Sequence, residues 1–103
     1  MIDSKFLSAV KHAAFLLNAS RGQLINENDL ANALKKGVIA RAALDVLAVE
    51  PPADGNPLIR LNNCIITPNN AWISCEARKR IMQTTFSNVQ NALTGDPQNF
   101  VNP

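Results

Sequence analysis

The sequence is poor in the residues that bind metals and form disulfides. Its 103 residues include one histidine, His12, and two cysteines, Cys64 and Cys75. Because the cysteines do not have the spacing of metal ligands, we expect reduced thiols, no metal site and a cytoplasmic protein. The net charge is only +2, with acidic and basic residues interspersed. This charge gives no electrostatic basis for binding nucleic acid or an anionic membrane.

The sequence also lacks a long hydrophobic run. The run AAFLLNA at residues 13–19 is too short to span a bilayer and is soon followed by Arg21. The N-terminus has no basic start followed by an apolar segment, so we expect no signal peptide. A hydrophobic content of 47% and a charged content of 17% are typical of a globular protein, and the length predicts a single domain over residues 1–103.

Capping residues and apolar periodicity predict three helices. Asp3 is expected to cap a short helix. Asn26 is expected to cap a second helix, with Asp29 completing a capping box and Gly37 ending the helix. Ser74 is expected to cap a long third helix that carries an apolar stripe. Strands are expected in three apolar runs, at residues 13–19, 38–49 and 64–67.

The order of these elements predicts a parallel sheet. Helix, strand, helix, strand, strand and helix imply parallel pairing with right-handed crossovers. The apolar strands are typical of strands that are buried on both faces and need helices on both sides. Three strands and few helices barely provide that cover. The predicted fold class is therefore α/β, with the chain forming part of a larger doubly wound sheet that ends in a long helix.

Three motifs follow one another along the chain. They are Asn-x-x-Arg-Gly at residues 18–22, Ala-Leu-Asp-Val at 43–46 and Glu-Pro at 50–51. With these motifs the chain resembles the D-2-hydroxyacid dehydrogenases over nearly its whole length, and most of all their glycerate dehydrogenase and hydroxypyruvate reductase branch. The resemblance implies the second half of a Rossmann-like nucleotide-binding domain, together with the helix that returns to the substrate domain.

The phosphate-binding fingerprint of that family, G-x-G-x-x-G, does not occur in these residues, whose four glycines are at positions 22, 37, 55 and 95. Full-length members are much longer and carry the fingerprint after the first strand of the nucleotide-binding domain. We therefore expect a fragment. The resemblance implies NAD or NADP as the cofactor of the full-length family, with weak or no binding by this chain alone. Whether the chain is itself an enzyme stays open.

Reduction of a 2-keto acid needs a cation for the substrate carboxylate. Arg21 is the candidate because its guanidinium binds a carboxylate through two hydrogen bonds. The resemblance implies that Arg21 binds substrate, that Asn18, Ser20 and Arg21 lie at the cofactor, and that Asp45 accepts a hydrogen bond from the nicotinamide carboxamide. The alternatives are a surface arginine that closes a turn and a strand-end aspartate that caps a loop.

The reaction also needs a proton donor. The family pattern after the third strand is Thr-Pro-His, and here Asn69 occupies the His position. Asparagine has no proton to give near neutral pH, and loss of a general acid typically costs ~10²–10⁴-fold in rate. Glu50 resembles the glutamate that orients the catalytic histidine. Its alternative is a solvated loop acid before Pro51, because the histidine partner is absent.

Three interpretations remain. The first is a fragment of an NAD(P)-dependent enzyme that acts on 2-keto and 2-hydroxy acids. The second is a non-catalytic, self-associating α/β module derived from that family, and the third is a generic α/β scaffold. Strand 13–19 and helix 74–94 are expected to leave apolar surface uncovered. Uncovered apolar surface recruits partners, so we expect a homodimer or a larger homo-oligomer.

Overall fold

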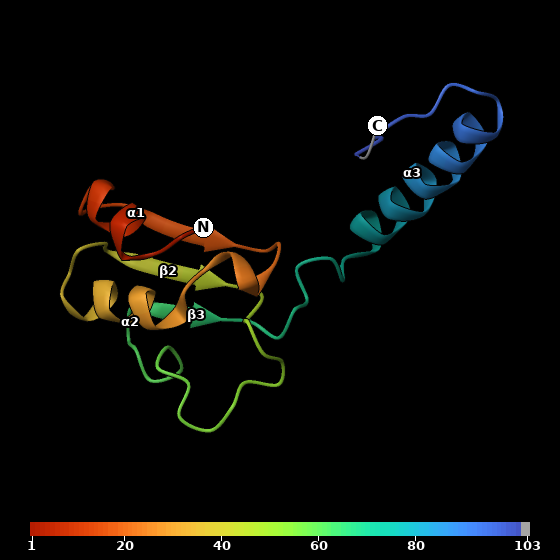
Figure 1. Ribbon diagram of the computed structural model, residues 1–103. Coiled ribbons are helices and arrows are strands. Elements are labelled where there is room, and N and C mark those ends of the chain that lie inside the picture. The colour runs from red at the N-terminus through yellow and green to blue at the C-terminus, as the bar shows by residue number, and fades with distance from the viewer. Residues whose placement is uncertain (102–103) are drawn as a thin grey trace. The chain divides into compact units, whose positions relative to one another are not determined.

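A computed structural model describes residues 1–101 and shows two compact units, one of residues 1–71 and one that begins at Trp72. The first unit contains α1 (Ser4–Ala9), β1 (Phe15–Asn18), the short 3-10 helix η1 (Gly22–Leu24), α2 (Glu27–Lys35), β2 (Arg41–Leu44) and β3 (Cys64–Ile66) (Figure 1). The second unit contains α3 (Cys75–Leu93). A single domain over the whole chain stays a prediction.

The three strands form one parallel sheet in the order β1-β2-β3. This confirms the predicted α/β class and the parallel pairing. The strands are shorter than the apolar runs that predicted them. The run 38–49, for example, contributes only four residues to β2. Its neighbour β1 pairs with it through four residues, and its neighbour β3 through three.

The hydrophobic core of the first unit lies between α1, α2 and one face of the sheet. Its most deeply buried side chains are Leu7, Leu30, Ile39 and Leu58. The other face of the sheet is uncovered, with Phe15, Leu17 and Ile65 exposed by 65%, 75% and 63%. The expectation that the strands are buried on both faces is therefore wrong for this structure, since the helices of this unit pack against one face only.

The predicted helix caps are confirmed. Asp3, Asn26 and Ser74 each accept a hydrogen bond from the backbone N–H three residues on, at 2.9, 3.1 and 3.1 Å. The capping box at α2 is not formed. The carboxylate of Asp29 instead accepts from the N–H of Ser4, and the N–H of Asn26 donates to the carbonyl of Ile2. A capping box would have paired the Asp29 carboxylate with the Asn26 N–H, and here both groups bond to the N-terminal segment instead.

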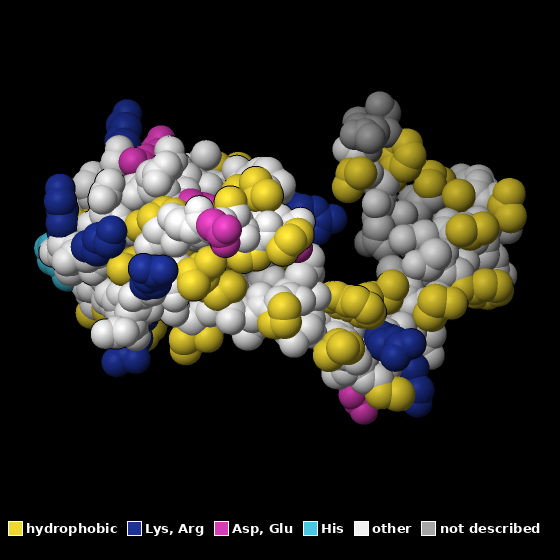
Figure 2. Space-filling model, turned by 90° about the horizontal axis from the view of Figure 1, so that it is seen from below, with side chains coloured by type: hydrophobic (Ala, Val, Ile, Leu, Met, Phe, Trp, Pro, Cys, Tyr) yellow, Lys and Arg dark blue, Asp and Glu magenta, His cyan; other side chains and the backbone are white. Residues whose placement is uncertain are grey.

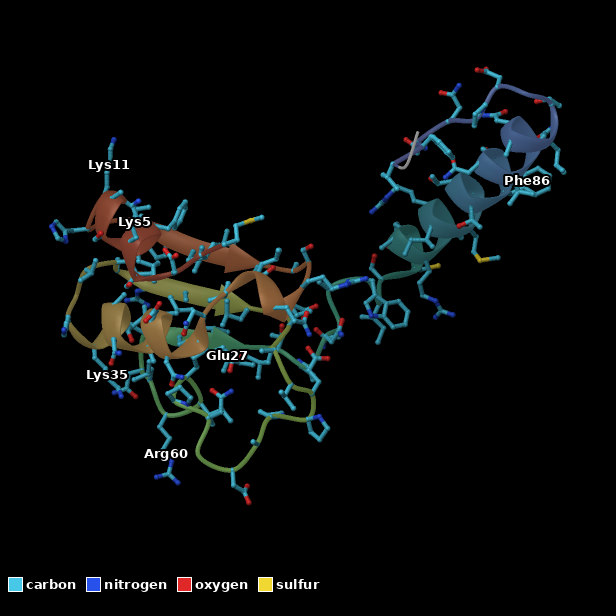
Figure 3. The ribbon with its side chains drawn as sticks, viewed as in Figure 1. Lys5, Lys11, Glu27, Lys35, Arg60 and Phe86 are labelled. Carbon is cyan, nitrogen blue, oxygen red and sulfur yellow. The ribbon has the colours of Figure 1, made fainter. Side chains whose placement is uncertain are left out.

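The helix α3 has no buried side chain among its residues. The predicted apolar stripe is present on it, and the large hydrophobic side chains there are exposed by 52–83%. They are visible over the surface of α3 in the space-filling view, and Phe86 projects outward from the helix (Figures 2 and 3). No helix in the described part of the chain is long and apolar enough to cross a membrane.

Candidate functional site

Three loops of the first unit follow the C-terminal ends of the three strands. Residues 19–22 follow β1, residues 45–50 follow β2 and residues 67–71 follow β3. Because the strands are parallel, these loops begin at the same edge of the sheet, where open α/β sheets bind ligands. Every residue that the sequence singled out for function lies in these loops or at the end of β1.

The loop after β1 is shaped by Asn18, whose side chain is 7% exposed. Its Oδ1 accepts from the N–H of Ser20 at 3.0 Å, and its Nδ2 donates to the carbonyl of Arg21 at 2.9 Å. Arg21 is exposed, and its Nη1 donates to the carbonyl of Ser20 at 2.8 Å. Asn18 therefore acts within the protein by holding the turn that presents Arg21.

Gly22 lets this turn contact the loop after β2. A Cβ atom at residue 22 would lie 2.0 Å from the carbonyl carbon of Leu47 and 2.4 Å from the nitrogen of Ala48. These are backbone atoms, so a side chain at this position can be accepted only if one loop moves. The glycine of the Asn-x-x-Arg-Gly motif thus fixes the distance between the loop of Arg21 and the loop of Glu50.

Asp45, which is 7% exposed, fastens the loop after β3. Its Oδ1 accepts from the hydroxyl of Thr67 and from the N–H of Asn70, and its Oδ2 accepts from the N–H of Ala71 at 2.9 Å. The Thr67 hydroxyl and the Ala71 N–H hold the pKa of Asp45 below its usual value, against the opposing effect of burial. The predicted alternative of a loop-capping aspartate is therefore what the contacts show.

Glu50 pairs with the residue at the position of the family's histidine. Its Oε2 accepts from Nδ2 of Asn69 at 3.0 Å, and its Oε1 accepts from the N–H of Leu47 at 2.9 Å. These two bonds, the Leu47 N–H first, lower the pKa of Glu50, although burial and the charge of Asp45 oppose them. Glu50 is therefore an ionised acid with bonded oxygens. The side chain is exposed, so a solvated loop acid and a bonded partner of residue 69 both stay open as interpretations of Glu50.

One cavity of about 340 Å³ brings the predicted residues together. Ser20, Arg21, Glu50 and Asn69 all line it, together with the backbone segment 46–48. A second cavity of about 330 Å³ shares Glu50 and Asn69 with the first and is walled mainly by apolar side chains, among them Ile66. Asn18 and Asp45 line neither cavity, and their side chains form hydrogen bonds to the backbone of the loops.

Two residues that hold the site were not foreseen from the sequence. Glu27, at the N-terminal end of α2 (Figure 3), accepts from the N–H of Ala48 at 2.7 Å and from the Asn56 amide at 2.8 Å. The amide of Gln23 donates to the carbonyl of Ala48 at 3.1 Å. An acid in the first helical turn was visible in the sequence, but its partner 21 residues away was not. Among the described residues, no cluster of His, Cys, Asp and Glu could hold a metal ion.

Relatives of known name match almost the whole chain. It is 42% identical to the hydroxypyruvate reductase of Blautia hydrogenotrophica over 102 residues, which is 99% of this chain and 32% of that protein. It is 44% identical to the glycerate dehydrogenase of Methylorubrum extorquens over 103 residues, 98% of this chain and 33% of that protein. The chain thus spans about a third of the length of these relatives.

Solved structures show the same fold. An acyclic imino acid reductase in complex with NADPH and D-Arg is 39% identical, with a TM-score of 0.76 over 96% of this chain and 31% of its own. A probable 2-hydroxyacid dehydrogenase from Rhizobium etli, in complex with NADP, is 30% identical, with a TM-score of 0.75 over 99% of this chain and 33% of its own. The predicted Rossmann-type α/β fold is thereby confirmed.

The family comparison covers the unit that carries the cavity. Residues 1–71 match the family described as D-isomer specific 2-hydroxyacid dehydrogenase, NAD binding domain. The boundary of this match coincides with the boundary of the first compact unit. The chain therefore belongs to the D-isomer specific 2-hydroxyacid dehydrogenases, a family of NAD(P)-dependent enzymes, and its residues 1–71 are sequence of their NAD-binding domain.

Proposed function

We propose that this chain supplies the substrate carboxylate site and part of the nicotinamide site of a D-2-hydroxyacid dehydrogenase, and that it does not turn over a 2-keto acid by itself. The observation that carries the proposal is the cavity that Arg21, Glu50 and Asn69 line together. These three residues come from three different loops. Gly22 lets the backbones of two loops touch, and the Asp45 carboxylate accepts from the N–H of Ala71 in the third.

Arg21 is the group that binds the substrate. It is exposed at the cavity and carries a permanent positive charge, which suits the carboxylate of a 2-keto or 2-hydroxy acid. The names of the relatives, hydroxypyruvate reductase and glycerate dehydrogenase, support a small acid of this kind. The acyclic imino acid reductase that shares this fold is named for the reduction of a C=N bond instead.

Asp45, at the start of the loop after β2, is the group proposed to accept a hydrogen bond from the nicotinamide carboxamide. Among the described residues its Oδ2 accepts one hydrogen bond, and a carboxylate oxygen has room for a second. This fits the N–H of a carboxamide, and NAD or NADP supplies the hydride when it is bound. Ser20 lines the cavity beside Arg21, and Asn18 acts on both through the turn. Without G-x-G-x-x-G in these residues, we expect binding of the dinucleotide to be weak or absent.

The proposal is tested by separating binding from turnover. Purified chain should bind oxamate, an unreactive analogue of a 2-keto acid, and Arg21→Gln should abolish this binding. With hydroxypyruvate or glyoxylate and NADH or NADPH, the same chain should consume no cofactor. Steady NADH oxidation that Arg21→Ala abolishes would contradict the absence of turnover. Failure of oxamate to bind would contradict the carboxylate site.

A second candidate function is a self-associating α/β module without catalysis. It is favoured by the uncovered face of the sheet, with Phe15, Leu17 and Ile65 exposed, and by the exposed stripe of α3. Exposed edge strands and apolar faces favour self-association, and we propose a homodimer or larger species. Light scattering at micromolar concentration tests this proposal. A monomer mass at every concentration removes it.

The two cysteines and the net charge are the basis of the proposed cellular location and ligand class. Cys64 and Cys75 are both free thiols, which supports a reducing compartment such as the cytoplasm. The net charge of +2 supports a small-molecule ligand over nucleic acid or a membrane surface. Labelling of the two thiols in intact cells, followed by mass spectrometry, measures whether they are reduced there.

A further inference from the structure

The cavity lined by Arg21 has two side chains of opposite charge and, among its lining residues, no histidine that could act as a general acid. Arg21 and the ionised carboxylate of Glu50 both line it. Asn69 lines the same cavity, and its Nδ2 donates to Glu50 at 3.0 Å. An amide does not ionise, so the Glu50–Asn69 pair carries a net charge of −1. A histidine at residue 69 would be able to carry a balancing positive charge, whereas the asparagine cannot.

We propose that the group reduced at this site is the iminium carbon of a 2-imino acid, a zwitterion whose carboxylate binds Arg21 and whose cationic nitrogen faces Glu50. This inference rests on the proposed carboxylate site and names its substrate class. The site has one positive group, Arg21, and one negative group, Glu50. The substrate has a negative carboxylate for the first and a positive nitrogen for the second. A keto acid carries only the negative charge and leaves Glu50 without a cation.

The missing proton donor favours the same substrate. Reduction of a carbonyl leaves an alkoxide, which must be protonated as it forms. An iminium group, C=NH₂⁺, already carries its proton. Its carbon accepts a hydride with both electrons from a reduced nicotinamide dinucleotide, the π pair of the C=N bond moves onto nitrogen, and the product is a neutral amine. Water protonates that amine afterwards, so the step needs no acid at residue 69.

The hydrogen bonds of Glu50 favour its ionised form. Each of its oxygens accepts one hydrogen bond, from Leu47 N–H and from Asn69 Nδ2, which favours the ionised form and leaves acceptor positions for a ligand. The loop that carries Glu50 is in contact with the loop of Arg21 at Gly22, so the two backbone segments that carry the charges are held together before a ligand arrives. The volume of about 340 Å³ is enough for a small zwitterion.

A matched pair of small ligands tests the proposal on the chain itself. Glycine and glycolate share a carboxylate and differ in the group on the 2-carbon, which is an ammonium in glycine and a hydroxyl in glycolate. Neither is chiral. We would titrate the purified chain with each, and with oxamate, and follow the backbone amides of the loops that line the cavity by NMR. Glycine should bind about 1.5-fold to fivefold more tightly than glycolate, the range expected for one exposed ion pair.

Variants separate this inference from the proposed function. Glu50→Gln should remove the preference for glycine and keep glycolate binding, whereas the same change at the exposed Glu76 of α3 should leave the preference intact. Asn69→His should weaken glycine relative to glycolate at pH 6, because an imidazolium repels an ammonium. Equal binding of the two ligands, or a preference that survives Glu50→Gln, overturns the iminium assignment while oxamate binding stands. Failure of oxamate to bind removes the carboxylate site and this inference with it.

Discussion

The two units of this chain use their hydrophobic residues in opposite ways. In residues 1–71 the large aliphatic side chains meet between a sheet and two helices, and Leu30 is fully buried. In the unit that begins at Trp72, a helix of 19 residues has a regular apolar stripe and buries none of it. An apolar stripe in the sequence therefore indicates that a helix requires a partner, and it does not indicate that the partner is present.

The two units also differ in the charged residues that line their cavities. The first unit holds its loops with side-chain and backbone hydrogen bonds, and the cavity with Arg21 lies among them. In the second unit, a cavity of about 560 Å³ lies along the exposed face of α3 and is lined by both Arg78 and Lys79. No acid lines that cavity, whereas the site of the first unit has both signs of charge.

The largest expected effect is the loss of a core leucine in the first unit. Leu30 is 0% exposed, so Leu30→Ala should lower the free energy of unfolding by about 2–5 kcal/mol. Leu93 of α3 is 83% exposed, and Leu93→Ala should change the free energy of unfolding by less than about 0.5 kcal/mol. Chemical denaturation followed by circular dichroism measures both. Similar losses for the two variants would show that α3 is buried in solution against a partner.

Alanine at Gly22 should have the next largest effect, because it forces backbone atoms apart. We expect a loss of about 3 kcal/mol, the upper end of the usual range for an overpacked site, together with loss of oxamate binding. Gly95 is the matched control, since a Cβ there meets nothing within 4 Å and only its φ of +84° opposes alanine. Gly95→Ala should cost about 1–2 kcal/mol and leave oxamate binding unchanged. Unchanged binding in Gly22→Ala would mean that the loops do not depend on this contact.

The fold was largely predictable because its signals are local. Asp3, Asn26 and Ser74 cap helices through bonds three residues long, and Gly37 ends α2 with a φ of +67°. The apolar runs predicted where the strands lie but not how many residues pair. Strand length depends on the neighbouring strands, and the cover of each face depends on which helices are present. Both are tertiary properties.

The candidate site was predictable in its residues and not in its contacts. Motif order identified Arg21, Asp45, Glu50 and Asn69. The carboxylate of Asp29 was wrongly expected to accept from the N–H of Asn26, because the N–H of Ser4, 25 residues away, donates to this carboxylate instead. The contact between Glu50 and Asn69 was also not expected from the sequence. It became visible once β2 and β3 were paired, since the loops that carry the two residues follow adjacent strands.

The two cysteines give a smaller contrast between the units. Burial raises the pKa of the Cys64 thiol in β3, whereas Cys75 is exposed at the start of α3. Because the thiolate is the reactive form, iodoacetamide at pH 8 should modify Cys75 about tenfold faster than Cys64. Peptide mapping by mass spectrometry measures the two rates. Denatured chain, in which the rates should converge, is the control.

The smallest expected effect concerns the titration of Asp45. Its pKa lies below the value of about 3.9 in unfolded chains, so ionised Asp45 stabilises the fold above that pH, and this contribution is lost as the pH falls through the folded pKa. Thr67→Val removes the largest cause and should raise the pKa towards its usual value. Thr94→Val, whose hydroxyl donates only within the end of α3, should leave it unchanged. Carboxyl ¹³C NMR between pH 2 and 6 measures each titration.

The backbone of residue 69 has a consequence for how such a site changes its chemistry. Its N–H donates to the carbonyl of Asp45 at 2.8 Å, and its φ is 51°, in the left-handed region. Asparagine and histidine both enter that region more readily than most residues. Exchange of one for the other therefore adds or removes a titratable proton while the main chain stays where it is. A change at this one residue can therefore alter which protons the cavity supplies without a change in the path of the backbone.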